Sequence, residues 1–150
     1  MRILLVDDSI HHRRAAVKQM AALGHTVAVF NSYVESIEAA RQEKFDVALI
    51  DLLMPAESQT LGQEGMAQHF GVEMAVGYPL AIKLATLGIP RIAVATDTNH
   101  HNHPASAAVD WFAGASVMIN GAEVRFIHSP MCQGDKGMVK DWAQVLSQFG

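Results

Sequence analysis

The chain has 150 residues, about the length of one domain, and half of them are apolar, which is enough for a substantial core. Its net charge of −4 offers no broad attraction for nucleic acid. No stretch approaches the ~20 apolar residues of a membrane helix. The single cysteine, Cys132, excludes an intrachain disulfide and fits a reducing compartment. We therefore expect one soluble, cytoplasmic domain over residues 1–150.

Short apolar runs alternate with amphipathic stretches along the chain. The runs are typical of buried strands, and the stretches between them carry apolar residues at helical spacing. Strands alternating with helices predict βαβ units, a mostly parallel sheet and helices on both of its faces. The five strands expected in this way cover residues 3–6, 26–30, 45–50, 91–96 and 116–119.

Two segments depart from this alternation. Residues 55–77 contain four glycines and are too long for an ordinary loop, so we interpret them as an insertion with a short helix near 64–70. Asn120-Gly121 separates two apolar runs and predicts a hairpin, with a sixth strand over 123–127 antiparallel to the fifth.

The C-terminal segment predicts one amphipathic helix. On this interpretation Lys136 and Lys140 belong to the helix and face solvent. Its apolar stripe consists of Met138, Val139, Trp142, Val145, Leu146 and Phe149.

Acidic residues stand where the predicted strands end. Asp7 and Asp8 follow the first strand, Asp51 ends the third, and Thr96 ends the fourth. Ligands of open α/β sheets bind beyond the carboxyl ends of the strands, so these side chains should meet in one crevice. Repulsion among three carboxylates is costly without a cation, and hard oxygen ligands suit Mg²⁺.

Three motifs at this edge carry a resemblance to a known family. In MRILLVDDS a strand ends in paired acids, and in DVALIDLLMP a strand ends in the acid of a D-x-x-M-P pattern. In IAVAT a strand ends in a threonine. The order and spacing of these strand ends also match. Together they resemble the receiver domain of bacterial response regulators. The resemblance implies a three-layer, doubly wound, flavodoxin-like fold with parallel strand order 2-1-3-4-5, and the hairpin adds an antiparallel strand.

The resemblance also implies a role for each motif residue. Asp51 would be the phosphoacceptor, and Thr96 would be the switch residue that contacts the phosphoryl group. Asp8, Asp51 and the backbone carbonyl of Leu53 would ligate Mg²⁺ directly, and Asp7 would do so through water.

The chain departs from the family at several positions. Receiver domains carry a lysine at the end of the fifth strand, but this strand ends in Ile119-Asn120 here. An alternative alignment places His128 at the lysine position, although the chain length after Thr96 favours Asn120. Val117 replaces the family's aromatic residue, and Asp97 replaces the small residue after Thr96. These departures indicate an atypical receiver or a pseudo-receiver.

Histidines gather on the same rim of the predicted sheet. His100, His101 and His103 follow the fourth strand and are candidate ligands for a transition metal such as Zn²⁺. The alternatives are solvated loop residues or groups that titrate near neutrality. The other histidines expected on this rim are His11, His12 and His69.

The sequence is compatible with two functions. The first is a stand-alone receiver-like signalling protein of a two-component system, phosphorylated on Asp51 by a histidine kinase or phosphotransfer protein, with output through protein contact. The alternative is a degenerate pseudo-receiver that acts without phosphorylation as an interaction module, for instance as a homodimer. An enzyme is not expected, because Leu53 occupies the second acidic position of the D-x-D pattern of aspartate-nucleophile phosphatases.

Overall fold

The computed structural model describes residues 1–58 and 61–150. A six-stranded sheet forms the centre, in the order β2-β1-β3-β6-β8-β7. Its strands are β1 (Arg2–Val6), β2 (Thr26–Phe30), β3 (Val47–Asp51), β6 (Arg91–Thr96), β7 (Ser116–Ile119) and β8 (Ala122–His128). Every neighbouring pair is parallel except β7 with β8. The predicted α/β fold and parallel strand order are confirmed.

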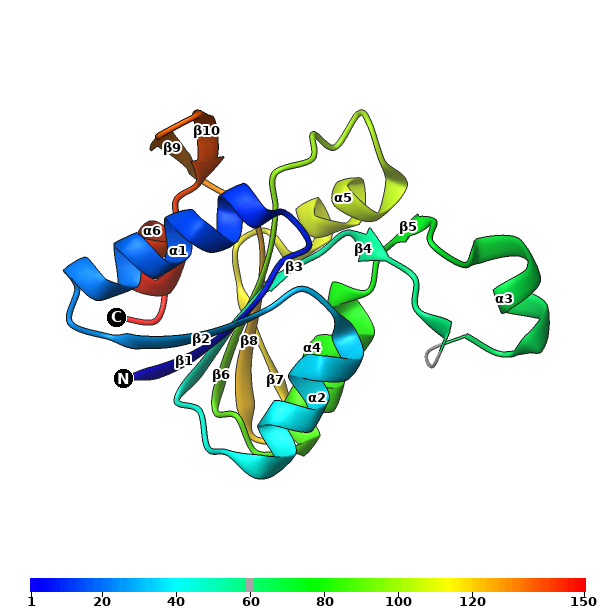
Figure 1. The fold of residues 1–150 in the computed structure, drawn as a ribbon, viewed down its shortest axis with the longest axis horizontal. Helices are drawn as coiled ribbons and strands as arrows, with labels where there is room; N and C mark the ends of the chain where they lie inside the picture. Colours follow the sequence, from blue (N-terminus) through cyan, green and yellow to red (C-terminus); the bar gives the residue numbers. More distant parts are fainter. Residues whose placement is uncertain (59–60) are drawn as a thin grey trace.

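Helices cover both faces of the sheet, as Figure 1 shows. On one face lie α1 (Ile10–Ala22) and α6 (Trp142–Ser147). On the other lie α2 (Tyr33–Gln42), α4 (Gly77–Thr86), the short α5 (Pro104–Ala108) and the 3₁₀ turn η2 (Val109–Phe112). Among the described helices, none is long and apolar enough to cross a bilayer.

Strand alternation produces the two cores. In β1, Ile3 and Leu5 face α1 and α6, whereas Leu4 and Val6 face the opposite layer. All four side chains are fully buried, because successive residues of a strand point to opposite faces and both faces are covered. This double burial explains why the central strands appear in the sequence as continuous apolar runs.

The Asn120-Gly121 hairpin is confirmed, but the expected role of its first strand is wrong. The strand that pairs in parallel with β6 is β8, and β7 lies at the sheet edge, antiparallel to β8. The physical reason is burial: β8 has seven residues and buries Val124 and Phe126, whereas the four-residue β7 leaves Met118 exposed. The register pairs Thr96 with His128, so the alignment through Asn120 is also wrong.

The expected C-terminal helix is wrong in its first half. A second hairpin precedes it, formed by β9 (Met131–Gly134) and β10 (Gly137–Lys140), and α6 begins only at Trp142. Asp141 caps this helix by accepting a hydrogen bond from the backbone N–H of Gln144. The hairpin projects beyond the sheet and lies beside the first half of α1 (Figure 1).

The segment at 55–77, interpreted above as an insertion, leaves the central sheet. It contains α3 (Gln63–His69), close to the expected helix, and a small ladder between β4 (Met54–Pro55) and β5 (Glu73–Met74). In Figure 1 this segment extends away from the layers of the domain.

Gly77 marks the return of this segment to the core. Its backbone N–H donates to the carbonyl of Leu52 at 2.9 Å. A Cβ atom at this position would lie 2.7 Å from the carbonyl oxygen of Asp51 and 2.8 Å from Val94 Cγ1. The start of α4 therefore approaches the end of β3 at a distance that only glycine permits.

We expect Gly77→Ala to lower the free energy of unfolding by about 1–3 kcal/mol, because the new methyl group overpacks rigid backbone. Urea unfolding followed by circular dichroism measures this change. Gly65→Ala in α3 is the matched control, since its Cβ would make only an ordinary contact at 3.5 Å with the Leu61 side chain. Equal stability of the two variants would contradict the close approach.

Candidate functional site

The predicted acids converge at the carboxyl rim of the sheet. Asp7 follows β1 directly and is fully buried, and Asp51 ends β3 with 5% of its surface exposed. Asp8 is exposed. One carboxylate oxygen from each lies within 4.8 Å of one from each of the others. The pairing of β1 with β3 brings these acids together although more than 40 residues separate them in the sequence.

A lysine that the sequence pattern predicts on a solvent-facing helix lies inside this cluster. Lys140 ends β10 and is fully buried, so the expectation that it faces solvent is wrong. Its Nζ donates to Asp7 Oδ2 at 2.9 Å and to Asp51 Oδ1 at 2.6 Å. It also forms an ion pair with Asp97 Oδ1 at 3.3 Å. The family's lysine is absent from β8, but an ammonium group reaches the acids from a different strand.

Neighbouring groups fix the position of Lys140. Its backbone N–H donates to His12 Nδ1 at 3.2 Å, and its carbonyl accepts from Gln19 Nε2 at 3.1 Å. Both partners belong to α1. The Lys140 ammonium lies 5.3 Å from the ring centroid of Trp142. The first and last parts of the chain therefore hold this side chain in the pocket together.

The electrostatics of the cluster follow from one ammonium among several acids. Burial raises the pKa of Asp51 well above its ordinary value despite the attraction of Lys140, and the charges of Asp7 and Asp97 raise it further. Burial likewise raises the pKa of Asp7, and Lys140 opposes the shift. Burial alone would lower the pKa of Lys140, but Asp51, Asp7 and Asp97 together raise it, so the amine stays charged.

Asp97 differs from the two buried acids. His12 Nε2 lies 3.1 Å from Asp97 Oδ2, and this hydrogen bond holds the pKa of Asp97 well below its usual range, against partial burial. In the sequence, Asp97 stands out only as a departure from the small residue that follows the threonine in receiver domains. In the structure it also links α1 to the ammonium of Lys140.

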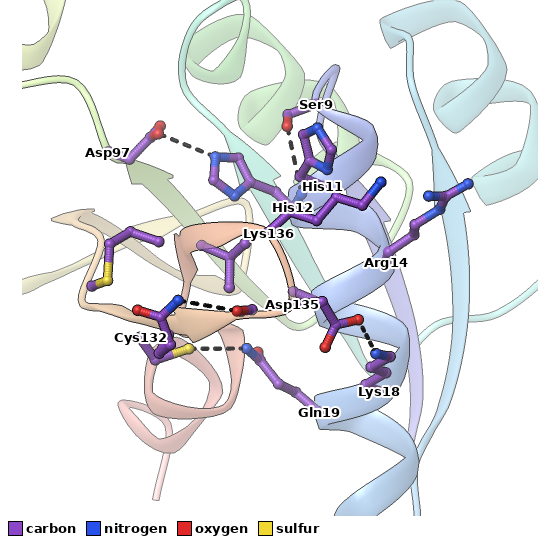
Figure 2. Close-up of a pocket in the computed structure, with 15 residues that line it drawn as sticks. Ser9, His11, His12, Arg14, Lys18, Gln19, Asp97, Cys132, Asp135 and Lys136 are labelled. Atoms are coloured by element: carbon purple, nitrogen blue, oxygen red, sulfur yellow. Dashed lines mark hydrogen bonds and ion pairs between the residues drawn. The ribbon is translucent and has the colours of Figure 1, made fainter.

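A groove runs beside this cluster between α1 and the β9–β10 hairpin, with a volume of about 490 Å³. Figure 2 shows its polar contacts: His12 points to Asp97, Lys18 pairs with Asp135, and Gln19 lies against Cys132. Burial raises the pKa of the Cys132 thiol, which does not favour a reactive thiolate.

Thr96 lies at the same rim, and its hydroxyl bonds to α5. Its Oγ1 is 3.1 Å from Ser106 Oγ, and both side chains are buried. It also accepts from the backbone N–H of Thr98 at 3.2 Å. Thr96 thereby connects the end of β6 to the helix that follows it.

Mg²⁺ remains compatible with the acidic rim. The carboxylates of Asp7, Asp8 and Asp51 are hard oxygen donors that lie close together, as this ion requires. The ammonium of Lys140 uses one oxygen each of Asp7 and Asp51, so an added ion would share these carboxylates with it.

The C-terminal sequence did contain a signal for the position of Lys140. Gly134-Asp135-Lys136-Gly137 is a turn-type sequence between two short runs, and Asp141 followed by Gln144 is typical of a helix start. Both features favour a hairpin before a short helix. The continuous apolar stripe nevertheless led to the prediction of a single helix.

Comparisons of the sequence with known proteins find a local similarity. No protein-family profile matches the chain. A stretch of 54 residues is 39% identical to Histidine kinase 5 of Arabidopsis thaliana, which amounts to 36% of this chain and only 6% of that protein.

Solved structures of receiver domains are similar over most of their length. The CheY-like receiver domain from Methanospirillum hungatei has a TM-score of 0.54 at 20% identity, over 86% of this chain and 81% of that one. A two-component response regulator from Clostridium difficile has a TM-score of 0.57 at 13% identity, over 99% and 95%. Chemotaxis protein CheY4 of Vibrio cholerae has a TM-score of 0.54 at 17% identity, over 99% and 93%. The chain has the receiver-domain fold, and the resemblance drawn from the sequence is confirmed at that level.

We expect Lys140→Met to lower the free energy of unfolding at pH 7 by about 3–5 kcal/mol, because it leaves two buried carboxylates without a counter-charge. Chemical denaturation measures the loss. Lys136→Met on the same hairpin is the control, since Lys136 is exposed. A loss below about 1 kcal/mol would show that the ion pairs contribute little.

Asp51→Asn should stabilise the protein at pH 7, and its advantage over wild type should shrink as the pH falls toward 4. The pKa of Asp51 is higher in the folded chain than in the unfolded chain, so the folded state binds more protons between those two values. Stability then decreases as pH rises through that window, and asparagine has no proton to lose. Thermal unfolding from pH 4 to 8 tests this.

Asp135→Asn is the control for the pH series. Asp135 is exposed and its pKa is lowered by the hydrogen bond from Lys18, so this variant should not gain stability as pH rises. An advantage of Asp51→Asn that grows toward low pH would contradict the assignment.

Proposed function

We propose that the chain is a receiver-type signalling module that accepts a phosphoryl group on Asp51. The observation that carries the proposal is the Lys140 ammonium, which lies 2.6 Å from Asp51 Oδ1 within the acidic rim. The missing lysine was the main reason to suspect a degenerate pocket. Lys140 brings a buried positive charge from β10 to Asp51, where receiver domains use their lysine. This charge favours the signalling module over the phosphorylation-independent alternative.

The proposed chemistry uses the two oxygens of Asp51 differently. Lys140 bonds to Oδ1, while Oδ2 has no hydrogen-bond partner among the described residues. Oδ2 would attack the phosphorus of an acyl phosphate or phosphohistidine, forming a new P–O bond while the donor's bond to phosphorus breaks. The leaving group takes the bonding electrons, and the ammonium offsets charge on the phosphoryl oxygens.

Mg²⁺ would be held by Asp8, Asp51 and the backbone carbonyl of Leu53, with Asp7 reached through water. When bound, it neutralises charge on the phosphoryl oxygens. Asp8 suits this role because it is exposed, whereas the Asp7 carboxylate already accepts from Lys140 and from the backbone N–H of Ser9.

The proposed output runs through Thr96. A phosphoryl group on Asp51 would compete with Ser106 for the Thr96 hydroxyl, because Asp51 and Thr96 end neighbouring strands. Loss of the Thr96–Ser106 contact would change how α5 is held. The partner that reads this change would be a signalling protein, and the donor a histidine kinase or phosphotransfer protein.

The test is phosphorylation with a small donor. Incubation with acetyl phosphate and Mg²⁺ should add the mass of one phosphoryl group to wild type and none to Asp51→Asn. Asp8→Asn should lose the Mg²⁺ dependence, and Lys140→Met should react more slowly. The control Asp135→Asn should react like wild type.

Two results would contradict the assignment of Asp51 as the phosphoacceptor. If wild type gains no mass with acetyl phosphate and shows no spectral change with beryllofluoride, the phosphoacceptor assignment is wrong. If Asp51→Asn gains the same mass as wild type, another residue is modified. The first result would favour a phosphorylation-independent interaction module, and the second would rule out Asp51 as the phosphoacceptor.

A further inference from the structure

A second cluster of potential ligands lies outside the acidic rim. His100 follows β6, Asp110 lies in η2, and His128 ends β8. One nitrogen or oxygen atom from each lies within 4.8 Å of those of the other two. All three residues are exposed, so an ion from solvent can reach them.

Within this cluster the distances suit a tetrahedral metal. His128 Nε2 lies 2.7 Å from Asp110 Oδ1, and His100 Nδ1 lies 3.5 Å from Asp110 Oδ2. A Zn²⁺ ion with bonds of about 2.0–2.1 Å places neighbouring tetrahedral ligands about 3.3 Å apart. The two distances lie on either side of this value and end on different oxygens of Asp110. Movements of these exposed side chains would be needed to bring one carboxylate oxygen and both imidazole nitrogens around an ion.

We propose that His100, Asp110 and His128 form a binding site for Zn²⁺ or a similar borderline cation. Two imidazoles and one carboxylate are a mixed nitrogen and oxygen set, which suits Zn²⁺, Ni²⁺ or Cu²⁺ rather than Mg²⁺. The site is thus chemically distinct from the all-oxygen rim around Asp51. Three protein ligands leave a fourth position for water or for a group from a partner.

His101 contacts His100 of this site. Its Nε2 lies 2.9 Å from His100 Nε2, and the two rings meet edge to face with centroids 4.1 Å apart. If His100 donates from Nε2 to His101, its Nδ1 lone pair is free for the metal. Metal-bound histidines commonly use their second nitrogen in this way, so His101 is a positioning residue.

The third histidine expected to bind a metal has another partner. His103 Nδ1 accepts from the backbone N–H of Ala105 at 3.0 Å and caps α5. The structure thus assigns the metal site to His100, Asp110 and His128, which come from three different segments. Only the fold brings Asp110 and His128 to the loop that carries His100.

The site lies next to Thr96. His128 is the register partner of Thr96, and the N–H of Ser129 donates to the Thr96 carbonyl at 2.7 Å. A bound ion would tie the loop after β6 to η2 and to the end of β8. The proposal does not depend on phosphorylation of Asp51.

Isothermal titration of the whole chain with Zn²⁺, in excess Mg²⁺ to occupy the acidic rim, tests the site. Wild type should bind one equivalent, and His100→Ala, Asp110→Ala and His128→Ala should each abolish that binding event. His101→Ala should weaken it by about 10–100-fold. His69→Ala, which removes an exposed histidine of α3, should bind like wild type.

Co²⁺ absorption provides a second measurement. Co²⁺ should give the intense visible bands of a tetrahedral complex with wild type, and these should be lost in His128→Ala. Zn²⁺ binding unchanged in all three ligand variants would overturn the proposal, as would the absence of binding by wild type.

Discussion

The acidic rim of this protein depends on the ion pairs that the buried Lys140 ammonium forms with Asp7 and Asp51. Asp7 and Asp51 are both nearly inaccessible to solvent, and two ionised carboxylates cannot share such a site without a counter-charge. Lys140 supplies that charge through two short hydrogen bonds. The sheet can therefore bring β1 and β3 together with their acidic ends buried.

This arrangement explains the second hairpin. The family's lysine position at the end of β8 holds His128, whose imidazole contacts Asp110 rather than the acids. The β9–β10 hairpin extends the chain past the rim and returns a lysine to it at the end of β10. Contacts with His12 and Gln19 of α1 fix the backbone on both sides of this residue.

Two kinds of ligand chemistry are thus separated along one sheet edge. The acids at the ends of β1 and β3 supply oxygen donors, and the segments around the ends of β6 and β8 supply imidazoles. Thr96 lies between them, with its hydroxyl on Ser106 and its carbonyl on Ser129.

The sequence by itself determined the layers and half of the site. Continuous apolar runs such as residues 3–6 identify strands buried on both faces, and the acids that follow them must lie at the carboxyl rim. Local patterns also identified the Asn120-Gly121 hairpin and the helix near 64–70. The sequence could not decide which strand of the hairpin pairs with β6, because pairing depends on which strand can bury both faces.

Only the tertiary structure placed Lys140 and His128. In sequence, Lys140 stands beside an apolar stripe, and an isolated lysine is ordinarily solvated. Its burial becomes favourable only when three acids from distant segments surround it, and no local pattern reports that. His128 depends in the same way on the register of β8 against β6. Long-range charge pairing and strand register decided these positions, because both arise from contacts between residues far apart in the chain.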